Sequence, residues 1–161
     1  MEKLLNQLRY IKVAAVCMFF ALCGNLFKGD ALVSWYSQLK LPSFTLPALY
    51  FFAMGFVFYI ICGIVLYKLF SEEKSKNETF VLIAMVICMM AYYTIWDLVF
   101  FGLKSPMAGL VAYIPFTLLV FYIFYRVARL YPVVAIAFLP FIGWLGYAFF
   151  WLMSLYLLNK S

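Results

Sequence analysis

The sequence contains no histidine and few charged residues. Of its 161 residues, charged side chains make up 11%, against about 25% in a typical soluble domain. The absence of histidine excludes imidazole acid–base catalysis, Ser-His triads and His-ligated zinc or haem. The four cysteines show no C-x-x-C spacing and lie in apolar stretches, which is typical of buried, unreactive thiols. We therefore expect no catalytic residue, no metal site and no resident cofactor.

Apolar residues are far more frequent than a soluble protein of this length can bury. They make up 69% of the chain, and the mean hydropathy is +1.05. Lipid must therefore surround most of the protein. This composition excludes a soluble enzyme and a disordered chain. The net charge of +6 comes from scattered Lys and Arg, so we expect contact with membrane lipid and no binding of nucleic acid.

Five apolar stretches are long enough to cross a bilayer, which takes about 20 helical residues. They are continuously apolar rather than alternating, which favours helices over strands. No A-x-A cleavage site follows the first stretch, so we expect a retained helix rather than a secretory signal. The sequence predicts an all-α integral membrane protein, a single domain (1–161) formed by a five-transmembrane-helix bundle. The predicted helices cover about 11–27, 47–70, 79–102, 107–130 and 132–158.

The first connection, over residues 28–46, is long and rich in aromatic and apolar side chains, Trp35, Tyr36 and Phe44 among them. Such a segment is unlike a solvated loop, and we predict that it folds over the bundle as a lid. We call residues 28–46 the lid.

Positive charge predicts the orientation. The N-terminus and the second and fourth loops share one side of a five-span protein, and their Lys and Arg outnumber those on the other side by eight to four. We therefore predict a cytoplasmic N-terminus and an outward-facing lid.

Asp97 is the one acidic residue inside a predicted span. A carboxylate in hydrocarbon is costly, so Asp97 should face the bundle interior or a water-filled pocket. It then either orients a ligand or carries a proton. Alternatively, it reaches toward the end of its helix and meets Lys104 or water. The sequence leaves both interpretations open.

Two spans carry aromatic faces. Trp96 and Phe100 are four residues apart, and Trp144, Ala148 and Trp151 also share one side of a helix. If these faces meet beneath the lid, they form an aromatic pocket that suits a flat apolar ligand. Core packing is the more common meaning of such faces.

Three motifs resemble the TspO/translocator protein family. The run WYSQLKLPSFTLP (Trp35–Pro47) is similar to the family's first-loop signature W-Y-x-x-L-x-K-P-x-W-x-P-P, although Phe44 replaces the second Trp. In the third span, YTIWDLVFFG is similar to N-x-x-W-S-x-x-F-F-G, with Tyr93 and Asp97 replacing Asn and Ser. In the fifth span, the matches to L-x-P-Y-x-x-W-x-x-x-A-x-x-L-N-x-x-I-x-x-L-N are Pro140, Trp144, Ala148, Leu158 and Asn159.

This resemblance implies a five-helix bundle, able to form a homodimer, that binds a porphyrin or another planar apolar small molecule under the first loop. Sterols and synthetic aromatic amides are further ligands of the family. It also implies a sensory or transport role and a location in a bacterial cell membrane. Asp97 or Tyr93 would orient the ligand. By position, the ligand-binding residues would be Trp35, Pro42, Phe44, Pro47, Phe51, Tyr93, Trp96, Asp97, Phe100, Trp144 and Ala148.

One departure from the family bears on catalysis. Some bacterial members degrade protoporphyrin in light with two pocket tryptophans. Trp144 occupies one of these positions, but Gly55 occupies the other. We therefore expect a binding protein rather than an enzyme. The alternative is a small membrane transporter that uses Asp97 for proton or cation coupling.

Overall fold

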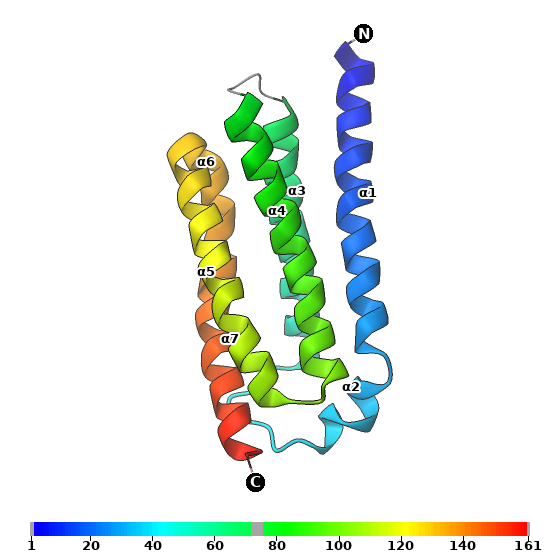
Figure 1. The fold of residues 1–161 in the computed structure, drawn as a ribbon, viewed down its shortest axis with the longest axis vertical. Coiled ribbons are helices and arrows are strands. Elements are labelled where there is room, and N and C mark those ends of the chain that lie inside the picture. Colours follow the sequence, from blue (N-terminus) through cyan, green and yellow to red (C-terminus); the bar gives the residue numbers. More distant parts are fainter. Residues whose placement is uncertain (1, 72–75, 161) are drawn as a thin grey trace.

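The computed structural model describes residues 2–71 and 76–160, and these contain helices and no strand (Figure 1). Five helices are long and apolar enough to cross a membrane. The prediction of an all-α, five-helix integral membrane protein is thus confirmed. The long helices are α1 (Glu2–Lys28), α3 (Ala48–Ser71), α4 (Lys76–Asp97), α5 (Pro106–Leu130) and α7 (Leu139–Leu158).

The first helix and the lid differ from their predictions. Helix α1 begins at Glu2 rather than at about residue 11, and it ends at Lys28. Hydropathy finds the part of a helix that lies in hydrocarbon, whereas the backbone hydrogen bonds continue into the polar residues before it. The lid is also more ordered than a loop. It contains the single-turn helix α2 (Ala31–Ser34) and the 3₁₀ turn η1 (Tyr36–Gln38).

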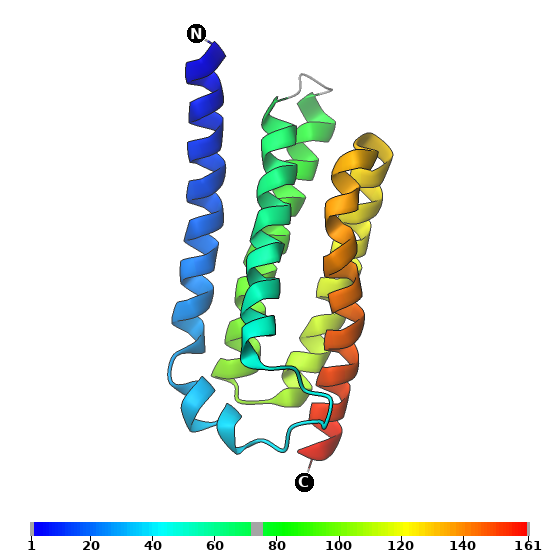
Figure 2. The ribbon, with the colours of Figure 1, turned by 180° about the vertical axis from the view of Figure 1, so that it is seen from behind.

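The bundle has two different ends. Helices α3, α4, α5 and α7 pack around one another, and α1 packs against α3 and α4. The N-terminus lies at one end, whereas the lid and the C-terminus lie together at the other (Figures 1 and 2). The end away from the lid is filled by buried aliphatic side chains. They include Val65, Leu66, Leu69, Leu82, Val86, Val120, Ile123 and Val127.

Near the lid, α4 continues into the π-helical segment η2 (Leu98–Gly102). A π-turn is wider than an α-turn and often marks a functional site. Here it carries Phe100 and Phe101, both buried. The tight turn after it ends at Ser105, whose hydroxyl accepts a hydrogen bond from the Ala108 amide at 3.2 Å and caps α5.

The chain turns sharply again after α5. Pro132 begins α6 (Pro132–Ala135), where a missing amide hydrogen costs nothing. The 3₁₀ turn η3 (Ile136–Phe138) joins α6 to α7. These three elements together form the fifth span, over the predicted range 132–158.

Candidate ligand-binding site

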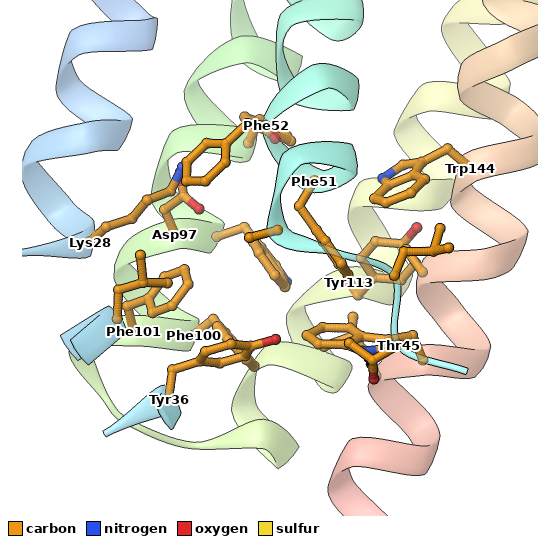
Figure 3. Close-up of a pocket in the computed structure, with 18 of the residues that line it drawn as sticks. Lys28, Tyr36, Thr45, Phe51, Phe52, Asp97, Phe100, Phe101, Tyr113 and Trp144 are labelled. Atoms are coloured by element: carbon orange, nitrogen blue, oxygen red, sulfur yellow. Dashed lines mark hydrogen bonds and ion pairs between the residues drawn. The ribbon is translucent and has the colours of Figure 1, made fainter. Parts of the chain in front are cut away.

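A cavity of about 600 Å³ lies between the lid and the lid end of the helices (Figure 3). Its walls come from the lid, α3, α4, η2, α5 and α7, with Lys28 from the end of α1. The lining on α4, η2, α5 and α7 is buried or partly buried. The exposed members of the lining all belong to the lid or the start of α3, so the cavity opens there. They are Leu32, Leu41, Pro47, Ala48 and Phe52.

The structure brings nine of the eleven predicted ligand-binding residues to the cavity. Trp35 and Phe44 are the two that do not line it. Trp35 packs edge-on against Phe100, with ring centroids 5.4 Å apart, and so lies behind the wall. Phe44 is 46% exposed and packs against Tyr147 instead. The nine lining residues are Pro42, Pro47, Phe51, Tyr93, Trp96, Asp97, Phe100, Trp144 and Ala148.

One aromatic wall is held by contacts between α4, η2 and α5. The rings of Trp96 and Phe100 stack nearly parallel, with centroids 5.1 Å apart and an angle of 7°. The Trp96 indole N–H donates a hydrogen bond to the Gly109 carbonyl at 2.9 Å. This bond satisfies the one polar atom of the indole. The ring can therefore lie in an apolar wall without leaving a buried N–H group unpaired.

A second aromatic wall joins α3, α7 and the lid. The Phe51 ring packs against both Trp144 and Trp151, with centroid distances of 5.1 Å and 5.0 Å. The Trp151 indole N–H donates to the Thr45 hydroxyl of the lid at 3.1 Å. Trp144 and Trp151 therefore lie on the same side of α7, as the spacing predicts, and both face the cavity.

Several lining residues were missed by the sequence analysis. Tyr113 and Phe116 come from the fourth span, which carries no recognisable motif. Their three-residue spacing places them on one face of α5, and this was the available signal. Tyr36 and Thr45 lie within the first-loop motif, but the motif does not show which of its side chains point inward.

The polar end of the cavity is an ion pair between α1 and α4. The Lys28 ammonium lies 3.5 Å from the Asp97 carboxylate, and Figure 3 shows the two side chains meeting beside Phe52. Asp97 thus faces the bundle interior, and its charged partner is Lys28 rather than Lys104. Lys28 follows the predicted first span and was expected in the lid, whereas it ends α1, so this pair was not predicted.

Side chains of α7 and of Asn159, which directly follows it, hold the lid in place. The Asn159 amide accepts a hydrogen bond from the Lys40 N–H and donates one to the Lys40 carbonyl, both at 3.0 Å. The Tyr147 hydroxyl accepts a bond from the Leu46 N–H, also at 3.0 Å. These bonds satisfy lid backbone groups that have no helical partner. They fix the lid across the cavity.

Tyr36 is the lid's phenol at the cavity. Its ring packs against Phe100, Phe101 and Trp151. Burial raises the pKa of the Tyr36 hydroxyl, with a further contribution from Tyr147. The hydroxyl therefore stays protonated at neutral pH and can donate a hydrogen bond to a bound molecule.

The sequence profile of the TspO/MBR family matches residues 13–157. The chain belongs to the TspO/MBR family. Two relatives of this TspO/MBR protein carry the name Tryptophan-rich protein TspO. The one from Archaeoglobus fulgidus is 28% identical over 96% of this chain and 99% of its own length. The one from Chlorobaculum tepidum is 24% identical over 83% of this chain and 84% of its own length. The resemblance inferred from the three motifs is confirmed.

Proposed function

We propose that this TspO/MBR protein binds a flat, hydrophobic small molecule such as a tetrapyrrole beneath its lid. The observation that carries the proposal is the aromatic cavity of about 600 Å³. Small-molecule sites span about 300–1,000 Å³ and combine apolar walls with a few polar groups. This cavity has both, because Lys28, Asp97 and Tyr36 lie among its aromatic side chains.

Burial of the ligand's apolar surface would provide most of the affinity. Each 100 Å² of apolar surface removed from water contributes about 2.5 kcal/mol before ordering costs. The walls suit a planar molecule because indole and phenyl rings line them. A sterol-like ligand, a sensory or transport role and a homodimer remain further parts of the proposal.

The Lys28–Asp97 pair favours binding over the alternative of a proton- or cation-coupled transporter. In the structure the Lys28 ammonium lies 3.5 Å from the Asp97 carboxylate, so a coupling ion would have to compete with this resident cation. Catalysis is less favoured for a different reason. At position 55, where the family pattern has a tryptophan, a glycine borders empty space.

The test is a titration of the purified protein with protoporphyrin, followed by the absorbance change of the ligand. We expect saturable binding to the wild-type protein. In the Ala148→Phe variant, a phenyl ring would project into the cavity from α7, because Ala148 lines it and is buried. Binding should then weaken at least tenfold.

The matched control is Ala84→Phe, the same change on the exposed side of α4, well away from the lid. This variant should bind like the wild type. We choose absorbance over tryptophan fluorescence, because a coloured ligand absorbs the light itself and this inner-filter effect imitates quenching. Equal affinities for the wild type and Ala148→Phe would place the ligand outside this cavity and overturn the proposal.

A further inference from the structure

A second, smaller cavity adjoins the first on the side of α1. Its volume is about 170 Å³, and it is lined by residues of α1, α3 and α4. A cavity of about 150 Å³ holds a molecule of six heavy atoms, so this side chamber can hold one substituent of a larger ligand. The wall shared by the two cavities consists of Lys28, Phe51, Phe52, Tyr93 and Asp97.

Two glycines keep the side chamber open and its wall polar. A Cβ atom at Gly24 would lie 3.0 Å from the Asp97 carboxylate oxygen, and one at Gly55 would lie 3.1 Å from the Tyr93 hydroxyl. Larger residues at either position would therefore press on these oxygens. With glycine at both, the side chamber stays open beside the Lys28–Asp97 pair and the Tyr93 hydroxyl.

The ammonium of Lys28 has hydrogen-bonding capacity left over. It carries three N–H donors. Within residues 2–71 and 76–160, its recorded partners are Asp97 at 3.5 Å and the Phe52 ring, whose centroid is 5.9 Å away. The Lys28 side chain is 25% exposed, whereas that of Asp97 is 5% exposed. The cation is thus the member of the pair that an incoming group can reach.

We propose that Lys28 binds a carboxylate carried by the flat ligand, at the junction of the two cavities. The apolar body of the ligand lies in the main cavity, and its acidic substituent extends toward the side chamber. Asp97 is the resident counter-ion, which neutralises Lys28 in the empty protein and competes with the ligand's acid. This inference rests on the proposed function and adds the group that would recognise an acidic substituent of the ligand.

The experiment compares a planar acid with its neutral ester, protoporphyrin against its dimethyl ester, in an uncharged detergent that supplies no competing anionic headgroup. The dissociation constant of the ester divided by that of the acid measures the preference for the acid. This ratio isolates the contribution of the carboxylate. In Lys28→Met the preference for the acid should fall about tenfold, because a charge-assisted hydrogen bond is lost. In Asp97→Asn the preference should rise several-fold, because the competing anion is gone.

Each single variant leaves one charge of the pair without its partner, and this charge can destabilise the fold. The double variant Lys28→Met/Asp97→Asn avoids this problem. It places no charge at the junction, so the ester should bind as in the wild type and the preference for the acid should be lost. The control is Lys104→Met, an exposed lysine at the same end of the molecule, which should leave the ratio unchanged.

The outcomes separate this inference from the proposed function. If the ratio stays constant across the charge variants while the ester still binds, Lys28 does not bind the carboxylate, and the cavity remains a site for an apolar ligand. If neither acid nor ester binds to the wild-type protein, the proposed function itself is overturned. A rise in acid affinity in Asp97→Asn supports the inference most directly, because loss of a merely structural ion pair would not strengthen binding.

Discussion

Gly109 sets how closely α4 and α5 approach at the cavity wall. A Cβ atom there would lie 2.4 Å from the Phe100 ring, and the Gly109 carbonyl accepts the Trp96 indole hydrogen bond. In Gly109→Ala, we expect the added methyl to push Phe100 aside and to disturb its stack with Trp96. Overpacking of this kind costs about 1–3 kcal/mol. Thermal unfolding in detergent should show a lower midpoint, and protoporphyrin affinity should fall.

The control for this prediction is Gly146→Ala on α7, where an added Cβ meets no atom within 4 Å. Alanine is the better helix former, so the control should be neutral or slightly stabilising. If the two variants have the same midpoint of thermal unfolding, an added methyl at Gly109 does not displace Phe100 and the prediction is wrong.

At the residue scale, the sequence predicts what kind of side chain lies at the site better than which partner it meets. The cost of a carboxylate in hydrocarbon correctly places Asp97 inward. Its partner Lys28 lies on another helix, 69 positions earlier in the chain. Helical periodicity relates residues within one helix, and so it cannot reveal such a pair. For the same reason, the first-loop motif does not show that Trp35 lies behind Phe100.

At the scale of elements, hydrogen exchange can test how the lid is attached to α7 and Asn159. The Leu46 amide donates to Tyr147 and the Lys40 amide donates to Asn159. We expect Tyr147→Phe to speed hydrogen exchange at Leu46, and Asn159→Ala to speed it at Lys40. One hydrogen bond contributes about 0.5–1.5 kcal/mol, so each amide should exchange up to about tenfold faster.

The matched control is Tyr156→Phe, which also removes a phenol from α7. Tyr156 makes no side-chain hydrogen bond to the described part of the lid, so lid amides should exchange at the wild-type rate. Uniform acceleration across the lid in all three variants would indicate general loosening of α7 rather than loss of specific bonds.

The sequence predicts the spans well and the lid less well, and both results have a physical cause. A span is recognised from about 20 neighbouring residues, because contact with lipid imposes one requirement on all of them. The lid is held by side chains more than 100 positions away, Tyr147, Trp151 and Asn159. Its aromatic content predicts that it covers the bundle, but its single-turn helix and its attachments depend on these distant contacts.

For the whole molecule, the cavity lies at the lid end because the helices differ along their length. Toward the other end, the buried residues of α3, α4 and α5 are aliphatic, Val65, Val86 and Ile123 among them, and they fill the space between helices. Toward the lid, large aromatic rings such as Trp96 and Trp144 pack against neighbouring rings and line a cavity. The motifs predict these aromatic faces. Whether these faces meet depends on which helices are neighbours in the bundle. Hydropathy does not predict that.

The arrangement also fixes which charged groups share one side of the membrane. In the structure Lys28, Lys40, Lys104 and Lys160 belong to the lid end. A larger set of basic residues belongs to the other end, namely Lys3, Arg9, Lys12, Lys68, Lys76, Arg126 and Arg129. Positively charged residues are retained in the cytoplasm. The lid, and the mouth of the cavity with it, should therefore face away from the cytoplasm, so that a ligand would enter from outside the cell.

Cysteine labelling tests this orientation. In a variant whose four native cysteines are replaced by serine, Ser43→Cys places one thiol on the exposed surface of the lid, and Asn77→Cys places one at the opposite end. A membrane-impermeant maleimide added to intact cells should label Ser43→Cys at once and Asn77→Cys only after permeabilisation. The permeabilised sample is also the control for reactivity, because both thiols should then react. The reverse pattern would place the lid in the cytoplasm, and the ligand would then have to come from inside the cell.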